Sequence, residues 1–313
     1  MFEQEKSYSQ VRREFYEKYN GKIVPFVRMH EDSRKKKLYT AIITTSVLVI
    51  IALILLYFGA TANLSRGGQK GLTHIICWLF ILAIILPIGI KKSFENNIKK
   101  RIMPIVCSCF GNMKWSQGSY SYGELFVSSF VVPEYTSADY DDIFEGSYSN
   151  VNIEIVESEY IRGSGKNSKT VFDGVIVKLD MNKSFSGHTI IKPNSFMHIP
   201  PSKELHHTEL EDSEFNRRFD VFTNDEIDAR YLITPSFMER LKGLKTAFSA
   251  SSVSCAFFEN LLIVALPTNK DLFSICSLIK PIDDSKQYFQ MYEEIVSIIK
   301  LIDHFKLNQK IGI

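Results

Sequence analysis

The residues best suited to chemistry form one dense polar cluster in the C-terminal half of the chain. Within seven positions it contains five ionisable side chains, which are Asp225, Glu226, Asp228, Arg230 and Tyr231. Carboxylates beside a basic group are typical of general acid–base sites. No activated nucleophile, phosphate-binding loop or recognisable triad accompanies them. The sequence therefore favours a structural charge network that orients the helix predicted after Thr234, and we expect no catalytic residues.

Three histidines offer a second candidate site because imidazole and carboxylate are common zinc ligands. They are His198, His206 and His207, and they lie among the acidic residues Glu204, Glu209, Glu211 and Asp212. The neighbouring Pro200-Pro201 pair predicts an exposed loop. No pair of these residues has the helical i,i+4 spacing of a zinc motif with a third ligand nearby. We therefore expect no metal ligands and no cofactor here.

Two further patterns suggest binding sites but fit them poorly. The acidic run Asp139, Asp141, Asp142 and Glu145 is similar to a calcium loop, yet Ile143 occupies a position that needs an oxygen ligand. A solvated acidic turn is the better prediction. Cys107 and Cys109 lack the second ligand pair of a zinc site, so all five cysteines are predicted to be reduced.

Charge divides the chain into two different parts. Residues 1–120 contain eighteen Lys and Arg against seven Asp and Glu, whereas residues 121–313 contain nineteen against twenty-eight. The first part is therefore basic, by about +11, and the second acidic, by about −9. An acidic domain disfavours nucleic-acid binding.

Two long apolar runs in the basic part predict membrane-spanning helices. Residues 38–58 and 72–90 contain no charged side chain, and each is long enough to cross the roughly 30 Å hydrocarbon core of a bilayer as a helix. A cleaved signal peptide is the alternative, because Ala60-Thr61-Ala62 follows the first run. The long preceding region and the length of the run favour a stable anchor. Residues 1–37 then form an amphipathic N-terminal segment, which Gly21 and Pro25 are expected to interrupt.

Cations flank the two runs on one side. Nine cations lie just before the first run or just after the second. They are Arg34, Lys35, Lys36, Lys37, Lys91, Lys92, Lys99, Lys100 and Arg101. The short external loop, residues 59–71, has only Arg66 and Lys70. Positively charged flanks stay in the cytoplasm, so both termini are predicted to be cytoplasmic.

The rest of the chain predicts an α+β class. Residues 91–120 continue as a basic juxtamembrane helix and linker, and residues 121–313 form an acidic cytoplasmic domain. Alternating apolar residues predict strands at residues 151–155, 171–179, 188–192, 252–258 and 261–266, with a tight turn at Glu259-Asn260. Thr234-Pro235 predicts a helix start, and residues 283–305 an amphipathic closing helix. Together these elements describe a mainly antiparallel sheet with a C-terminal helix.

Three passages resemble the domain-of-unknown-function 3137 family. They are residues 144–154, residues 171–177 with 182–189, and the long stretch 211–241, which includes the polar cluster. This resemblance implies a bacterial protein anchored in the inner membrane, and it suggests a LemA-type membrane protein as partner. It supplies no catalytic residues.

These observations predict a membrane-anchored cytoplasmic interaction or scaffold module rather than an enzyme. The alternatives are a membrane-tethered enzyme that uses the Asp225–Tyr231 cluster and a lipid-sensing module of the pleckstrin-homology kind. The bilayer and a membrane protein are the expected partners. Homo-oligomerisation stays open.

Overall fold

The computed structural model describes residues 8–305 apart from 63–64, 149, 182–183 and 271. It consists of two compact units. Residues 12–105 and 274–288 form the first, here called the helical unit. Most of the remaining described residues form the second, here called the sheet domain. Residues 274–288, expected within the C-terminal domain, thus group with the helices.

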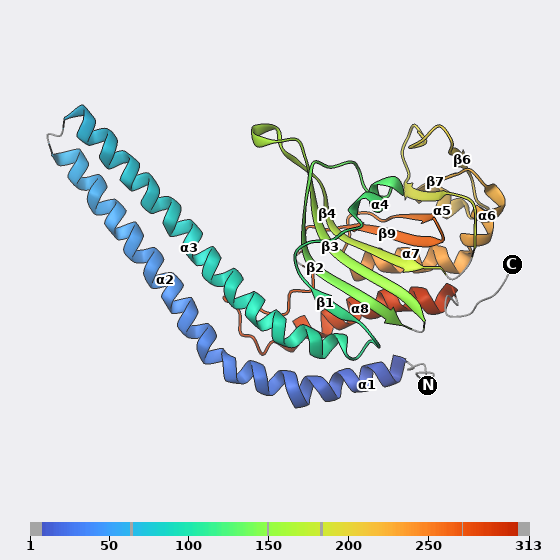
Figure 1. The fold of residues 1–313 in the computed structure, drawn as a ribbon, viewed down its shortest axis with the longest axis horizontal. Helices are drawn as coiled ribbons and strands as arrows, with labels where there is room; N and C mark the ends of the chain where they lie inside the picture. Colours follow the sequence, from blue (N-terminus) through green and yellow to red (C-terminus); the bar gives the residue numbers. More distant parts are fainter. Residues whose placement is uncertain (1–7, 63–64, 149, 182–183, 271, 306–313) are drawn as a thin grey trace. The chain divides into compact units, whose positions relative to one another are not determined.

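Two long helices make up most of the helical unit. Helix α1 (Tyr8–Lys18) passes through a π-helical turn (Tyr19–Ile23) into α2 (Val24–Thr61) without a break. The prediction that Gly21 and Pro25 interrupt this helix is therefore wrong, because the helix continues through both residues. The π turn accommodates Gly21, and Pro25 lies in the first turn of α2, where its missing N–H group is tolerated. Helix α3 (Arg66–Cys107) returns beside α2 (Figure 1) and contains Pro87 and Pro104.

The apolar stretches of α2 and α3 face outward. Only 11 % of the most apolar window of the first helix and 6 % of that of the second are buried within the protein. The core helix of a soluble protein would instead be mostly covered. Both helices are long and apolar enough to cross a membrane, and both extend beyond their apolar runs at each end.

A short non-helical segment, residues 274–284, ties the two helices together and is called the strap here. The Arg34 guanidinium donates to the Leu278 carbonyl oxygen at 2.7 Å and to both Glu31 carboxylate oxygens at 2.6 and 2.9 Å. Glu31 also accepts the Ile282 N–H at 3.3 Å. On α3, Glu95 accepts the Leu278 N–H at 3.3 Å. The bond from Arg34 lowers the pKa of Glu31, so this carboxylate keeps its charge.

The sheet domain is built on one nine-stranded antiparallel sheet, which confirms the α+β class. Its strand order is β1-β2-β3-β4-β9-β8-β5-β7-β6, so among the described residues β1 and β6 form its two edges. The strands are β1 (Lys114–Ser116), β2 (Ser137–Tyr148), β3 (Val151–Arg162), β4 (Lys169–Asp180), β5 (Thr189–Pro193), β6 (His206–Thr208), β7 (Phe219–Thr223), β8 (Ser254–Phe258) and β9 (Leu261–Pro267).

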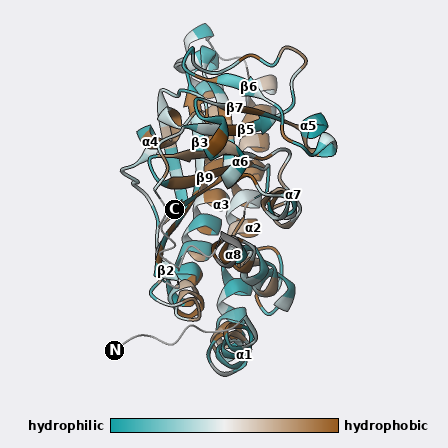
Figure 2. Ribbon diagram, turned by 90° about the vertical axis from the view of Figure 1, so that its right-hand side faces the viewer, coloured by the Kyte–Doolittle hydropathy of each residue, from teal (hydrophilic) through white to brown (hydrophobic). Residues whose placement is uncertain are grey.

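Both faces of the sheet are covered, which explains why the central strands β8 and β9 contain no charged residue. On one face, Phe126 of α4 (Gly123–Ser128) packs in a cluster with Ile176, Phe222 and Ile263. On the other, Phe237 of α7 (Pro235–Ala247) lies 5.4 Å from the Phe257 ring, between centroids. Strands β5, β7 and β9 are accordingly coloured hydrophobic in Figure 2. The remaining helices are the 3-10 turn Gly165–Asn167, α5 (Ser213–Arg218), α6 (Glu226–Leu232) and α8 (Ser285–Phe305).

Local sequence signals of the sheet domain are confirmed in detail. Phe258 pairs with Leu261, and the two intervening residues, Glu259 and Asn260, have φ of 50° and 62°, as a two-residue hairpin turn requires. The Thr234 hydroxyl accepts the Phe237 N–H and caps α7. Helix α8 forms where the amphipathic pattern predicts it.

The predicted acidic turn at residues 139–145 is wrong, because this segment lies within β2. Its acidic residues straddle a register shift between Tyr140 and Ile143. Asp142 is fully buried and accepts the Trp115 indole N–H at 2.7 Å, whereas Asp141 is exposed. A run of aspartates can therefore belong to a strand when a neighbouring strand supplies a donor.

A buried carboxyl group on α8 generates a pH-dependent prediction. Glu294 is 2 % exposed, and burial raises its pKa from 4.5 to about 6. The folded protein then binds this proton more tightly than the unfolded chain, so stability falls as the pH rises from 4.5 through 6. Replacing Glu294 with Gln should raise the free energy of unfolding at pH 7.5 by about 2 kcal/mol, from 1.36 kcal/mol per pKa unit, and much less at pH 4.5.

Thermal unfolding of the full chain in detergent at the two pH values measures this difference. The exposed neighbour Glu293→Gln is the matched control and should change little at either pH. If Glu294→Gln raised the free energy of unfolding equally at both pH values, the pKa of Glu294 would not be raised as stated.

Candidate functional site

The predicted polar cluster lies at the start of α6, directly after β7. Asp225 is the N-cap of this helix, and its Oδ1 accepts the N–H groups of Ile227 and Asp228, both at 3.0 Å. An extended backbone at Asp225 places the carboxylate over the first turn. This is the bonding pattern of a capping aspartate, which satisfies helix N–H groups that have no partner within the helix.

Asp228 holds the segment that leads into β5. Its Oδ2 accepts the N–H groups of Ser186 at 3.2 Å and Gly187 at 3.0 Å. A Cβ atom on Gly187 would stand 2.9 Å from the Asp225 Cβ and 3.2 Å from Asp228 Oδ2. Only glycine fits this close approach. Both aspartates thus fix backbone segments.

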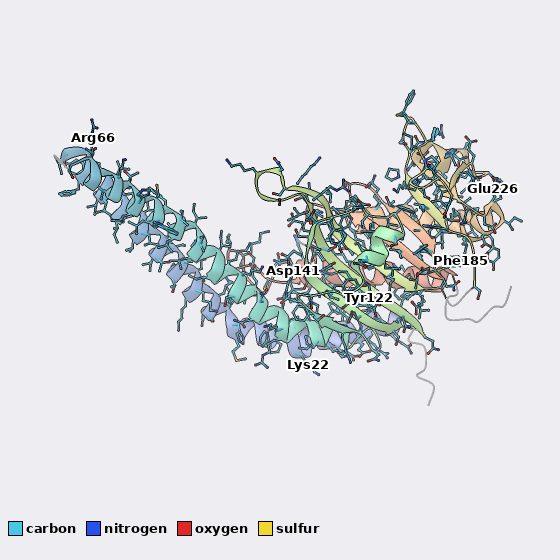
Figure 3. The ribbon with its side chains drawn as sticks, turned by 45° about the horizontal axis from the view of Figure 1, so that its top comes forward. Lys22, Arg66, Tyr122, Asp141, Phe185 and Glu226 are labelled. Carbon is cyan, nitrogen blue, oxygen red and sulfur yellow. The ribbon has the colours of Figure 1, made fainter. Side chains whose placement is uncertain are left out.

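The other members of the cluster lie on the surface of α6. Glu226 is half exposed and lies 3.4 Å from His206 Nε2, at the outer end of the domain (Figure 3). Arg230 lies 3.9 Å from Glu226 and donates to the Glu209 carbonyl oxygen at 3.1 Å. Tyr231 is 47 % exposed. Asp225 and Asp228 accept backbone N–H groups, whereas Glu226 and Arg230 lie beside each other on the surface of α6. These contacts favour the structural interpretation of the cluster.

The histidines come together with a residue that the sequence did not single out. His206 and His207 lie on β6 and His198 lies on the loop from β5 to β6, while Asp220 lies on β7. Asp220 Oδ1 is 2.6 Å from His198 Nδ1 and 3.6 Å from His207 Nε2. The two imidazole rings are 4.7 Å apart between centroids. His206 faces away, toward Glu226.

Strand register explains how Asp220 enters this group. His207 pairs with Phe222 on the neighbouring strand, and Asp220 lies two residues along β7 on the same face. The second oxygen of Asp220 accepts the N–H group of Ser195 at 2.9 Å and its hydroxyl at 3.2 Å. Lys192 is opposite Asp220 on β5, and burial lowers its pKa. The sequence does contain a signal that could have identified this buried carboxylate. In the triplet Phe219-Asp220-Val221 a polar residue lies between two apolar ones.

Another histidine, His188, is half-buried and packs against aromatic side chains. It lies just before β5, its ring stacks 5.7 Å from Phe130 between centroids, and it is 4.5 Å from the Phe258 ring. Burial lowers its pKa, so it is neutral at physiological pH. These contacts assign it a packing role.

Apolar side chains gather on the surface at the same end of the sheet domain. Among its described residues, six large hydrophobic side chains are exposed, and five of them belong to the β5–β6 loop or to α6. These five, here called the apolar patch, are Phe196, Met197, Ile199, Ile227 and Tyr231. Phe196 is 99 % exposed. Large exposed apolar patches are uncommon on soluble domains, which makes these five residues a candidate interaction surface.

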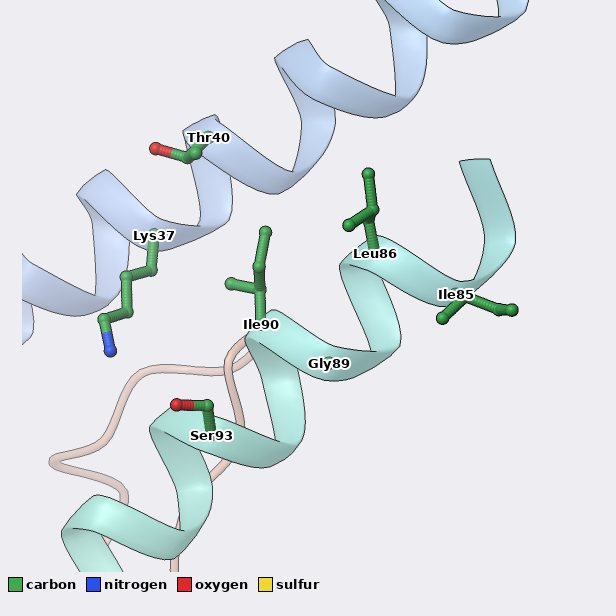
Figure 4. A pocket seen from close by; sticks show the side chains of 7 residues that line it. All are labelled: Lys37, Thr40, Ile85, Leu86, Gly89, Ile90 and Ser93. Carbon is green, nitrogen blue, oxygen red and sulfur yellow. The ribbon is translucent and has the colours of Figure 1, made fainter. Parts of the chain in front are cut away.

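The helical unit contains a groove between α2 and α3 (Figure 4). Its volume is about 480 Å³, and it is lined by Lys37, Thr40, Ile85, Leu86, Gly89, Ile90 and Ser93. Lys37 and Ser93 lie toward one end of the groove and Ile85 and Leu86 toward the other, with Ile90 between them. Lys37 is the last cation before the apolar run 38–58, and Ile85 and Leu86 belong to the apolar run 72–90.

Together, the fold and these surfaces define an antiparallel α+β domain on a chain with two long apolar helices. Residues 170–307 match the family model described as Protein of unknown function (DUF3137). This match confirms the resemblance predicted for residues 171–177 with 182–189 and for 211–241, whereas residues 144–154 lie outside it. The match includes the histidines, α6 and the strap. No curated protein and no solved structure matches the chain.

The capping role of Asp225 leads to a simple test. Asp225→Ala should lower the free energy of unfolding by about 1 kcal/mol, the usual cost of losing an N-cap, whereas Asp225→Asn should retain most of the stability because asparagine caps equally well. Urea unfolding of the full chain in detergent measures both. Equal losses for Asn and Ala would show that the charge, rather than the cap, is what the protein requires at this position.

Proposed function

We propose that this protein is a membrane-anchored interaction module. In this proposal α2 and α3 cross the inner membrane of a bacterium, and the sheet domain and both termini lie in the cytoplasm. The exposed apolar stretches of both helices support the anchor. The bacterial origin follows the family resemblance.

The flanking cations support the orientation. Arg34 and Lys99 are buried within the protein, but the other seven flanking cations remain at the surface, against two on the external side. Cations on cytoplasmic flanks determine the orientation of a membrane hairpin.

The apolar patch is the observation that supports an interaction role. Phe, Met, Ile and Tyr side chains in water offer the type of surface from which protein interfaces draw most of their binding energy. Residues 121–313 carry a net charge of about −9, and an anionic membrane repels such a charge. We therefore infer a protein partner rather than a lipid surface. A membrane protein fits the location, and the family resemblance suggests the LemA type.

The contacts of the polar cluster favour this proposal over an enzyme. Asp225 and Asp228 are engaged by backbone N–H groups, so neither carboxylate is arranged as an acid or base toward a substrate. The open sheet also differs from the barrel of a pleckstrin-homology module, which the lipid-sensing alternative would use.

The orientation can be tested with reporter fusions. A reporter that is active only outside the cytoplasm should be active when inserted at residue 66 and inactive at residue 313, because the two positions lie on opposite sides of the proposed membrane. An active fusion at residue 313 would overturn the cytoplasmic assignment.

The interaction can be tested with a photo-crosslinking residue at position 199 in native membranes. One defined protein should be captured, and Phe196→Asp with Met197→Asp should weaken its binding at least tenfold, about 1.4 kcal/mol, when both proteins are purified. Lys203→Asp on the same loop changes the charge by the same amount and should leave binding unchanged. Binding of the wild-type chain to anionic lipid vesicles through the same two residues, without any captured protein, would favour the lipid alternative.

A further inference from the structure

We propose that His198, His207 and Asp220 form a binding site for a divalent transition-metal ion, with zinc as the principal candidate. The geometry of these residues, rather than the membrane or interaction roles, supports the site, although His198 lies between Met197 and Ile199 of the apolar patch. Its three residues come from separate segments, namely the β5–β6 loop, β6 and β7. Their ligand atoms all lie within 4.8 Å of one another.

The convergence of two imidazoles on one oxygen atom distinguishes this group from a simple hydrogen-bonded pair. His198 Nδ1 lies 2.6 Å from Asp220 Oδ1 and forms a hydrogen bond with it. His207 Nε2 lies 3.6 Å from the same oxygen, which is too far for a hydrogen bond. A structural pair would need only the first imidazole. The second is placed where a shared ion would complete its coordination.

The spacing can accept an ion with small movements. Ligand atoms of a tetrahedral zinc site lie about 3.3 Å apart, since the bonds are about 2.0–2.1 Å long. The 3.6 Å separation is already close to this value, and the 2.6 Å separation must open by about 0.7 Å. The side chain of His198 is 43 % exposed and belongs to a loop, so it can move outward, whereas Asp220 is held in the sheet.

The surroundings of Asp220 match those of a metal-binding carboxylate. Its Oδ1 faces the two imidazoles, and its Oδ2 accepts both the N–H and the hydroxyl of Ser195. Such outer hydrogen bonds orient ligating carboxylates and strengthen metal binding. The Asp220 side chain is 2 % exposed, so an ion beside it would balance a buried negative charge.

The donor set selects the class of metal. Two nitrogens and one carboxylate oxygen suit zinc and the neighbouring transition metals, whereas magnesium and calcium prefer oxygen ligands alone. Three protein ligands leave one position of a tetrahedral ion open to water or to a group of a partner.

The experiment uses the full chain in detergent, purified without a histidine tag and stripped with a chelator. Titration with zinc should show one ion bound per chain. Cobalt should give the visible absorption bands of a bound Co²⁺ ion, and zinc should abolish them. His207→Gln and Asp220→Asn should each weaken zinc binding at least tenfold, and Ser195→Ala should weaken it by a smaller factor.

His206→Gln provides the matched control, because His206 adjoins His207 on β6 but lies against Glu226 instead. It should bind zinc as the wild type does. Thermal unfolding of the chelated proteins verifies that each variant is folded, and Asp220→Asn preserves the shape of the buried side chain. Absence of zinc binding in the wild type, or equal binding by wild type and the folded Asp220→Asn variant, would overturn the proposal, as would an equal loss in His206→Gln.

Discussion

The helical unit depends on the hydrogen bonds of one buried group, the Arg34 guanidinium. It is 5 % exposed and connects the Glu31 carboxylate on its own helix with the Leu278 carbonyl oxygen of the strap. A buried arginine is tolerated only when charged and polar partners satisfy it, and removing one partner of such a pair typically costs about 3–5 kcal/mol. Glu31 and Glu95 then accept N–H groups of the same strap, so one short segment is bonded to both long helices.

This arrangement gives the strap a defined conformation although it has no regular secondary structure. Its backbone groups bond to side chains of α2 and α3 instead of to a neighbouring strand. Tyr288, at the start of α8, adds a bond from its hydroxyl to the Ile282 carbonyl oxygen and a ring contact with Tyr19. The π turn that contains Tyr19 is therefore part of the same packed region.

Much of the fold could be predicted from sequence because its signals are local. The apolar runs, the Thr234-Pro235 helix start, the Glu259-Asn260 turn and the face of α8 each follow from residues close together in the chain. Strand order could not be predicted, since β4 pairs with β9 and β5 with β7 and β8 across long separations. The grouping of the strap with the helices was missed for the same reason, because Arg34 and Leu278 are 244 residues apart.

In the polar sites, too, contacts between residues distant in the chain could not be predicted from the sequence. Sequence reasoning identified the polar cluster but assigned it to the helix after Thr234, whereas Asp225 caps a separate short helix, α6, that was not predicted. It also identified two of the three residues of the candidate metal site, His198 and His207, but not the buried carboxylate Asp220. The pairing of β6 with β7 brings them together, and that pairing depends on where the β5–β6 loop and α5 return the chain. Acidic neighbours in sequence, such as Glu209 and Asp212, were poor guides because Asp212 caps α5 instead.

The separation between Arg34 and the strap also determines the order of events during synthesis. A ribosome adds about 5–20 residues per second, so the Leu278 carbonyl emerges on the order of 10–50 s after the guanidinium that it binds. In the proposed topology the hairpin has entered the membrane by then. During this interval Arg34 lacks its bond to the strap and, with Lys35, Lys36 and Lys37, contributes to orienting the hairpin. When the strap binds, the Arg34 guanidinium becomes buried and donates its hydrogen bond to the Leu278 carbonyl oxygen. The same cation then stabilises the folded helical unit.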